Sequence, residues 1–233
     1  MFQFKQFTIQ QDRCAMKVGT DGVLLGAWAE GGSHILDIGT GTGLIACMMA
    51  QRFAEAQVEG IEIDSEASEQ ATENVAHSPF CRRISITNLS VQDYTEVCRE
   101  KGIRFDSIVC NPPYFSHSLK TPLQQRNLAR HADSLPAETL FKCVKALLEQ
   151  NGVFSLIIPK DQESLFMEAA IFNGFFTQRI CNIKTTPKKA PKRLLISFTL
   201  NHNSPTYQCE ETLQDFSGER SPWYAKITNN FYL

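Results

Sequence analysis

Short runs of aliphatic and β-branched residues alternate along this sequence with stretches of helical pattern. A run at 33–39 precedes a helical stretch at 43–54, and a run at 56–64 precedes another at 65–78, for which Ser65 is the expected N-cap. Strands that alternate with helices are typical of a mainly parallel sheet with helices packed on its faces. The alternation therefore predicts the α/β class.

The remaining runs complete a sheet of seven expected strands. The last two are joined by the eight residues TTPKKAPK, which are too few for a crossover helix, so they are expected to pair as an antiparallel hairpin. This basic connection is then expected on the same sheet edge as the end of the fourth strand. The further expected elements are strands at 83–90, 104–110, 153–159, 175–184 and 193–200, and a helix at 136–152 with Pro at its start and Gly at its end.

A glycine-rich turn, LDIGTGTG at 36–43, connects the first strand to the first helix. Gly39, Gly41 and Gly43 allow the backbone to turn sharply and to approach a ligand where a Cβ atom would clash. Nineteen residues beyond Gly43, Glu62 ends the second strand, where it is placed to bind a ribose diol. Together these features favour a nucleotide-type cofactor site over a plain tight turn.

The acidic residues near this turn bear on which cofactor binds. NAD would place a diphosphate at the helix N-terminus, where Asp37, just before the glycines, would repel it. S-adenosylmethionine instead presents an ammonium group, which suits Asp37. Asp93, at the end of the third strand, is able to accept a hydrogen bond from an adenine amino group, although a helix or turn cap is the alternative. The carboxylates therefore favour S-adenosylmethionine.

The fourth strand, at 104–110, ends on the sequence Asn-Pro-Pro-Tyr. Each proline lacks an N–H and fixes φ, so the strand cannot continue. The exocyclic amine of a base is a poor nucleophile because its lone pair is delocalised, and two acceptors around the NH₂ group favour a pyramidal nitrogen. The expected acceptors are the side-chain oxygen of Asn111 and the carbonyl of Pro112, held rigidly with Pro113, while Tyr114 offers a face for stacking the target ring. We interpret the motif as an amine clamp, with an ordinary turn as the alternative.

With Asp37, Glu62, Asp93 and NPPY in this order, the chain resembles the class I S-adenosylmethionine-dependent methyltransferases over roughly residues 15–200. The resemblance implies a seven-stranded Rossmann-like sheet, mainly parallel with an antiparallel last strand. It also implies that Glu62 binds the cofactor ribose, that the following Ile63 contacts the adenine, and that Asp93 holds the adenine amino group. NPPY is similar to the motif of enzymes that methylate adenine, rRNA guanine or protein glutamine, so it indicates a planar nitrogen acceptor.

Segments outside these motifs narrow the resemblance from the methyltransferase class to one subfamily. AMKVGTDGVLLGAWA at 15–29, ENVAHSPF at 73–80 and FSGERSPWYAKITNNFYL at 216–233 closely resemble the bacterial tRNA(Val) (adenine-N6)-methyltransferases. The resemblance implies methyl transfer to the N6 amine of the adenine just 3′ of the anticodon, at position 37. Thr20 opens a helix near the methionine end of the cofactor, with a cap-only role as the alternative, and Lys17 either reaches the cofactor carboxylate or is a surface charge.

The charge distribution supports an RNA partner, although the formal net charge is −2. From Ala169 to Cys209 there is no Asp or Glu, so the cations there are expected to lack counter-acids and to track phosphates, unless they only solubilise an edge hairpin. Just after NPPY, a polar segment with Arg126, Arg130 and His131 is expected to close over the target base or to be a solvated loop. The six cations of the basic region are Arg179, Lys184, Lys188, Lys189, Lys192 and Arg193.

Length and composition predict one domain and exclude several classes. The 233 residues divide into an N-terminal extension and helix at 1–30, a Rossmann-like core at 31–200 and a C-terminal segment at 201–233 that packs on the core. The eight cysteines form no C-x-x-C pair and are interpreted as reduced, mostly buried thiols, and the five histidines show no metal-ligand spacing. Without a signal-like start or a bilayer-length apolar run, we expect a cytoplasmic, metal-free monomer with no membrane partner.

Several functions share parts of this pattern. The leading one is methylation of tRNA(Val) adenine N6, and a protein glutamine N5-methyltransferase or an rRNA guanine-N2 methyltransferase would use the same NPPY clamp. A nicotinamide-dependent oxidoreductase would need a hydride-transfer acid, for which the sequence offers no candidate constellation. A non-catalytic RNA-binding protein would not need the intact set of Asp37, Glu62, Asp93 and Asn111.

Overall fold

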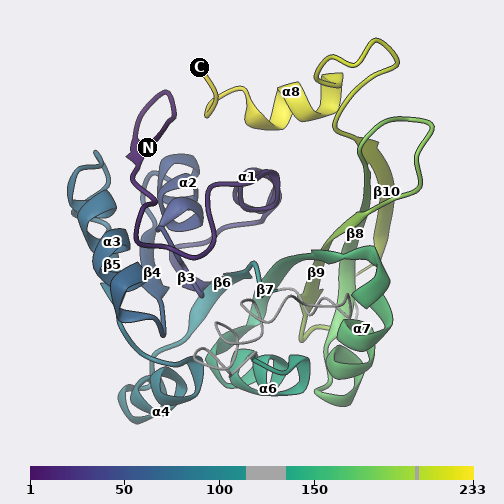
Figure 1. The fold of residues 1–233 in the computed structure, drawn as a ribbon. Coiled ribbons are helices and arrows are strands. Elements are labelled where there is room, and N and C mark those ends of the chain that lie inside the picture. Colours follow the sequence, from purple (N-terminus) through teal and green to yellow (C-terminus); the bar gives the residue numbers. More distant parts are fainter. Residues whose placement is uncertain (114–134, 203–204) are drawn as a thin grey trace, which may run out of the picture.

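The structure is a computed structural model, and it describes residues 1–113, 135–202 and 205–233 (Figure 1). Its centre is an eight-stranded sheet with the strand order β10-β8-β9-β7-β6-β3-β4-β5. A separate antiparallel pair, β1 (Phe2–Gln3) and β2 (Thr8–Ile9), precedes it in the chain. The strands of the sheet are β3 (His34–Ile38), β4 (Gln57–Ile61), β5 (Ile84–Thr87), β6 (Phe105–Cys110), β7 (Leu148–Pro159), β8 (Phe176–Lys184), β9 (Arg193–Thr199) and β10 (Tyr207–Thr212).

Helices cover both faces of this sheet (Figure 1). α1 (Thr20–Trp28), α2 (Leu44–Arg52), α3 (Ser65–Ala76) and α8 (Pro222–Thr228) lie on one face, and α4 (Val91–Lys101), α6 (Ala137–Leu147) and α7 (Glu163–Phe172) lie on the other. A short 3₁₀ turn at Lys160–Gln162 leads from β7 into α7. No helix among the described residues is long and apolar enough to cross a membrane.

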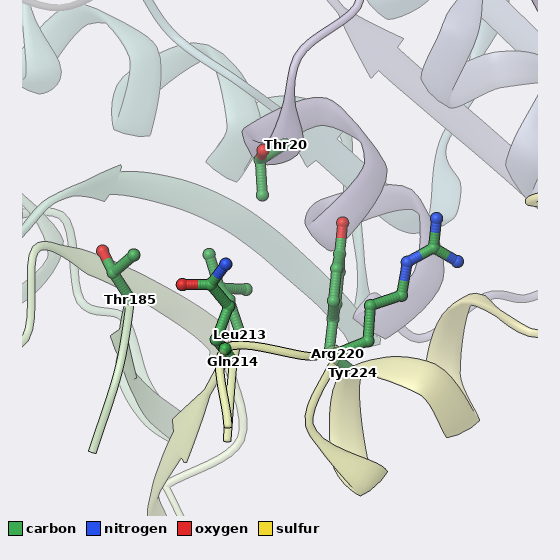
Figure 2. Close-up of a pocket in the computed structure, with 7 residues that line it drawn as sticks. Thr20, Thr185, Leu213, Gln214, Arg220 and Tyr224 are labelled. Carbon is green, nitrogen blue, oxygen red and sulfur yellow. The ribbon is translucent and has the colours of Figure 1, made fainter. Parts of the chain in front are cut away.

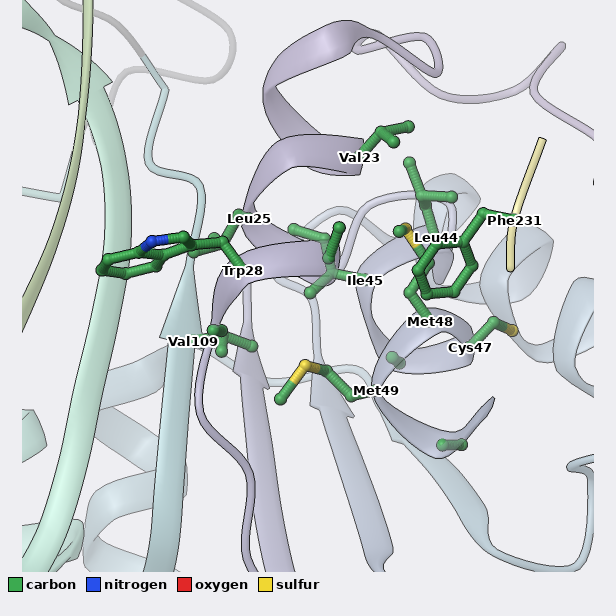
Figure 3. Close-up of a cluster of buried hydrophobic side chains, with 14 of the residues drawn as sticks. Val23, Leu25, Trp28, Leu44, Ile45, Cys47, Met48, Met49, Val109 and Phe231 are labelled. Carbon is green, nitrogen blue, oxygen red and sulfur yellow. The ribbon is translucent and has the colours of Figure 1, made fainter. Parts of the chain in front are cut away.

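The central strands are buried on both faces, and their side chains alternate between two hydrophobic clusters. Ile35, Val109 and Ile157 belong to the cluster under α1 and α2, whereas Leu36 and Ile108 belong to the cluster under α4, α6 and α7. Figure 3 shows the first cluster, in which α1 and α2 pack side by side on the sheet. This explains why the strands read as nearly continuous apolar runs, since neither face of a central parallel strand contacts water.

The expected α/β fold is confirmed, with each of the seven expected strands in place. β8 and β9 pair antiparallel, and β9 also pairs antiparallel with β7, while the other expected strands run parallel. An eighth strand, β10, was not expected, and it extends the sheet by pairing parallel with β8. Its sequence YQCEET is polar and it lies at the sheet edge, so it lacks the apolar pattern that marks the buried strands.

Two expected helix boundaries are wrong. The N-cap of α3 is Asp64 and not Ser65, because the Asp64 carboxylate accepts a hydrogen bond from the Ala67 amide at 2.9 Å. The helix expected to end at Gly152 ends at Leu147, and Leu148 already pairs with β6. Gly152 is therefore a strand residue, where a Cβ atom would lie only 3.0 Å from the Asp106 carbonyl oxygen.

The expected meeting of motifs at one edge of the sheet is also confirmed. Ile38 pairs with both Ile61 and Cys110, so the parallel strands β3, β4 and β6 end side by side. The basic connection at 185–192 leaves β8 at this same edge, because Arg193 at the start of β9 pairs with Pro159 at the end of β7. Ligands of open parallel sheets bind at such carboxyl ends.

Candidate active site

The glycine turn after β3 leaves open space above its backbone. Gly39, Gly41 and Gly43 have φ angles of 69°, 55° and 78°, in the left-handed region that glycine adopts without strain. Among the described residues, a Cβ atom on Gly39 would have no neighbour within 4 Å, and one on Gly41 would meet only the Gly39 carbonyl at 4.0 Å. Gly43 differs, since its Cβ would approach Ala71 of α3 at 3.5 Å. The first two glycines thus expose backbone to a ligand, and the third serves helix packing.

Asp37 lies under this turn and is completely buried. Its Oδ2 accepts hydrogen bonds from the Thr40 hydroxyl at 2.6 Å and from the Ala46 amide at 3.1 Å. Its Oδ1 is buried and has no hydrogen-bond partner within the described part of the chain. Burial raises the pKa of Asp37 to about 7, while the two hydrogen bonds act in the opposite direction. The residue therefore holds the turn with one oxygen and presents the other as an unused acceptor.

Glu62 follows β4 and is oriented by backbone donors. Its Oε2 accepts from the Gly41 amide at 2.9 Å, and its Oε1 accepts from the Asp64 amide at 3.0 Å. A carboxylate oxygen has more than one acceptor site, so both oxygens can still accept from ribose hydroxyls. The neighbouring Ile63 is 63% exposed, so its side chain is accessible to a ligand, and its contact with an adenine ring stays a prediction.

Asp93 takes the cap position that was the alternative interpretation. It lies in the first turn of α4 rather than at the end of a strand. The N-cap Ser90 accepts from the Asp93 amide at 3.1 Å and donates its hydroxyl to the Asp93 carboxylate at 2.7 Å. Because Asp93 is exposed, its carboxylate is not used up by this cap, and its contact with adenine stays a prediction.

Asn111 stands directly after β6, beside the glycine turn, since Cys110 pairs with Ile38. Its Nδ2 lies 3.6 Å from the sulfur of Met16. Pro112 is buried and Pro113 is exposed. Tyr114 and the arginines at 126 and 130 (Arg126 and Arg130) lie outside the described residues, as does His131.

The N-terminal segment at 10–19 crosses this edge of the sheet, and sequence reasoning missed most of its role. Asn74 of α3 exchanges two hydrogen bonds with the Gln10 backbone, both 2.8 Å long, and the Arg13 guanidinium forms an ion pair with Glu73. Cys14 is buried, and its pKa is raised to about 11 by burial and by the nearby Glu62 carboxylate. The segment therefore lies beside the glycine turn. It has no periodic apolar pattern that could have announced this.

Two expected cofactor ligands within or just after this segment have other contacts. Lys17 is exposed and donates its ammonium to the backbone carbonyl of Gln11. Thr20 is the first residue of α1 but does not cap it, because the N-cap is Gly19. Its side chain instead faces a pocket that Thr185 and the C-terminal segment also line (Figure 2). Cofactor contacts for both residues stay predictions.

The expectation that the basic region lacks counter-acids is wrong for three of its six cations. Arg193 donates its Nε to both oxygens of Asp21 at 2.9 Å, and Lys184 pairs with Glu210 of β10 at 2.6 Å. Arg179 pairs with Glu30 at 2.9 Å and packs its guanidinium 4.2 Å from the centre of the Trp28 ring. Their partners come from distant parts of the chain, so the local absence of acids was misleading. The other three cations of the basic region are exposed and have no ion pair in the described part of the chain; they are Lys188, Lys189 and Lys192.

The cysteines are mostly buried, and the described residues show no candidate metal cluster. Six of the eight cysteines are buried, as expected. Within the described ranges, no three His, Cys, Asp or Glu side chains are grouped so that they could hold a metal ion.

Comparison with known proteins links this geometry to one reaction type. The sequence model of the methyltransferase small domain family matches residues 18–176. A Bacteroides fragilis protein called tRNA1(Val) (adenine(37)-N6)-methyltransferase is 47% identical over 235 residues, which cover 100% of this chain and 97% of that protein. A Flavobacterium psychrophilum protein with the same name is 42% identical and is covered to 99%. The crystal structure of a predicted O-methyltransferase from Agrobacterium tumefaciens superposes with a TM-score of 0.72 at 20% identity, covering 91% of this chain and 96% of that one.

Proposed function

This chain belongs to the methyltransferase small domain family and to the tRNA1(Val) (adenine(37)-N6)-methyltransferases, and from this membership we propose that it methylates the N6 amine of adenine 37 in a valine tRNA. S-adenosylmethionine supplies the methyl group on a sulfonium, which leaves as a neutral thioether. The observation that carries the proposal is the position of Asn111, one residue beyond a strand that ends beside the glycine turn. An amine acceptor and a methyl donor would thus meet at one point of the sheet edge.

The residues at the glycine turn fit this cofactor. The space that a Cβ of Gly39 would enter is open, so a ligand can contact the backbone there. The unpartnered Oδ1 of Asp37 is an acceptor for an ammonium group, and the two oriented oxygens of Glu62 are acceptors for a ribose diol. The exposed Ile63 offers an apolar surface for adenine. Asp93 is the proposed acceptor for the adenine amino group, and Lys17 and Thr20 are proposed at the methionine end.

The clamp residues act on the acceptor. The amide nitrogen of Asn111 only donates, and it lies near the sulfur of Met16. The amide oxygen is therefore the atom of this side chain that accepts from the substrate amine, together with the Pro112 carbonyl. Two acceptors favour a pyramidal nitrogen with an available lone pair, and Tyr114 stacks on the ring. No strong base is required before attack, because methylation itself makes the nitrogen cationic and acidic. Catalysis then rests on positioning for in-line transfer.

The RNA is held by cations at the other end of the sheet edge. Lys188, Lys189 and Lys192 are exposed on the connection between β8 and β9, where they can neutralise phosphates of the anticodon stem and loop. An anticodon loop presents unstacked bases, so the target adenine is turned out at little cost. Arg126 and Arg130 are proposed to close over that base. The enzyme is proposed to act as a cytoplasmic monomer.

The test uses labelled S-adenosylmethionine and total tRNA from a strain that lacks this protein. Label is expected in N6-methyladenosine at position 37 of a valine tRNA after nucleoside analysis and isolation of the isoacceptor. Label in protein that survives ribonuclease would replace the proposal with glutamine methylation. Label only in guanine of ribosomal RNA would replace it with the rRNA reaction.

A further inference from the structure

A pocket of about 250 Å³ lies between the start of α1 and the C-terminal segment, and it shares Thr20 with the proposed cofactor site (Figure 2). Thr20 lines one side and Thr185, directly after β8, lines another. The C-terminal segment supplies the remaining lining residues, among them Gln214, Arg220 and Tyr224. Neither the cofactor contacts nor the amine clamp use the three C-terminal residues. Because Thr185 begins the connection that carries the exposed lysines, the pocket opens beside the proposed RNA surface.

The loop that forms much of this pocket, Gln214–Arg220, is held in one conformation. Oδ1 of Asp215 accepts from the Ser217 amide at 2.8 Å, the Ser217 hydroxyl at 2.5 Å and the Glu219 amide at 3.1 Å. Gln214 and Arg220 form a β-bridge, and the Gln214 amide donates to the Thr185 carbonyl at 3.0 Å. The pocket is therefore formed before a ligand arrives, which lowers the entropic cost of binding.

The chemistry of this loop fits single-stranded nucleic acid. Arg220 is exposed and has no ion pair within the described part of the chain, and its guanidinium lies 4.4 Å from the centre of the Tyr232 ring. A guanidinium packed on a ring still directs its N–H groups outward, where they can donate to a phosphate or a base edge. Phe216, in the same rigid loop, is 82% exposed. Phe216 lies outside the pocket lining but in the same loop as Arg220, and an exposed aromatic ring and an arginine on one loop can stack and hold an unpaired base.

The position of the pocket sets which nucleotide it could hold. Along the sheet, β6 and β8 are separated by β7 and β9, so three strand spacings of about 4.8 Å place the two strand ends roughly 15 Å apart. When the target adenine lies at the end of β6, a nearby nucleotide of the same loop could reach the end of β8. We propose that the pocket between Thr20, Thr185 and Arg220 binds a neighbouring nucleotide of the substrate RNA, with Phe216 stacking on a base. This inference rests on the proposed function.

The experiment measures the affinity of the full chain for a synthetic anticodon stem-loop of a valine tRNA, together with kcat and KM for methylation. Phe216→Ala is expected to weaken binding and raise KM about fivefold to tenfold, from the loss of one stacked base. Phe216→Trp should bind within twofold of the unaltered chain. The matched control is Phe172→Ala, because Phe172 is 86% exposed but ends α7, which leads into β8 at the opposite sheet edge.

Arg220 needs a second variant, because its packing on Tyr232 also contributes to the fold. Arg220→Gln is expected to weaken binding and to reduce the slope of log affinity against log salt by about 0.7, while Arg220→Lys keeps that slope. Thermal unfolding of both variants reports the structural part separately. Equal RNA affinity in Phe216→Ala, Arg220→Gln and the unaltered chain would overturn this inference while methylation of tRNA still supported the proposed function. If the unaltered chain bound the stem-loop but did not methylate it, only the proposed function would be overturned. If the unaltered chain bound no RNA, both the proposed function and this inference would be overturned.

Discussion

The two ends of the functional sheet edge hold their charged groups in different ways. At the cofactor end, Asp37 and Glu62 accept from backbone amides and one hydroxyl, and their partners lie no more than 21 residues away in sequence. At the RNA end, Arg193 is held by Asp21, 172 residues away, and the three exposed lysines have no ion pair among the described residues. The first end is rigid and locally encoded, whereas the second depends on the whole fold and on solvent.

This difference suits what each end has to recognise. A small cofactor needs acceptors fixed at a few points, and backbone donors fix a carboxylate without flexible side chains. An RNA backbone presents repeated charges, which exposed lysines on a short hairpin can follow at low cost in ordering. Substitutions at the two ends should therefore have different effects. At the cofactor end they should lower the methylation rate or the cofactor affinity, and at the RNA end they should change the salt dependence of RNA binding.

The largest expected effect is on chemistry, at the point between the two ends. Asn111→Ala should lower kcat for methylation by about 100-fold or more, because it removes an acceptor that acts on the reacting amine. The affinity for S-adenosylmethionine, measured by calorimetry, should stay within a few-fold. Asn173→Ala is the matched control, since Asn173 lies at the end of α7 and its side-chain amide donates to the Ala169 carbonyl. A variant that lost cofactor binding but kept turnover of bound complex would contradict the clamp assignment.

The buried Asp37 predicts a pH dependence of stability at the cofactor end. The pKa of Asp37 is about 7 in the folded chain and close to the ordinary aspartate value of 3.8 in the unfolded chain, so the folded state binds more protons between these two pH values. The contribution of Asp37 to the free energy of unfolding should therefore fall as the pH rises from about 4 to about 7, by about 2 kcal/mol or more, and then level off. Urea unfolding of the chain and of Asp37→Asn at several pH values measures this. Parallel curves for the two proteins would show that the buried carboxyl does not titrate in this window.

Gly39 and Gly102 have the same backbone conformation, so alanine substitutions at these two positions can distinguish the effect of backbone strain from the effect of blocking the cofactor site. Gly39 has φ 69° and Gly102 has φ 66°, and a Cβ on either would meet no atom of the described residues within 4 Å. Alanine at each position should lower stability by about 1 kcal/mol through the left-handed conformation. Only Gly39→Ala should weaken S-adenosylmethionine binding, by about tenfold, since its methyl group enters the space above the turn. Equal cofactor affinities in the two variants would place the cofactor elsewhere.

The same contrast explains what could be predicted from the sequence. The glycine turn, Glu62 and NPPY are short motifs whose partners follow within a few elements, so strand order alone brings them together. The ion pair of Arg193 and the edge strand β10 could not be predicted in this way, because an ion pair 172 residues apart leaves no local pattern and YQCEET has no apolar face. Asp93 was misplaced because β5 ends early, at Thr87, so that Asp93 lies in the first turn of the helix that Ser90 caps.

The smallest expected effects lie at the RNA end, where paired and unpaired cations can be compared. Replacing Lys188, Lys189 and Lys192 together with glutamine should weaken stem-loop binding several-fold and reduce its salt slope by about 2, since each neutralised phosphate of a single strand contributes about 0.7. Arg193→Gln should change the slope by much less than one lysine, because Asp21 already neutralises this guanidinium. It should lower stability by about 1 kcal/mol, because the pair is partly buried. Affinity titrations at several salt concentrations measure both. If Arg193→Gln reduced the slope as much as a lysine does, the ion pair would have to open on binding, and the distinction between paired and free cations at this end of the sheet would fail.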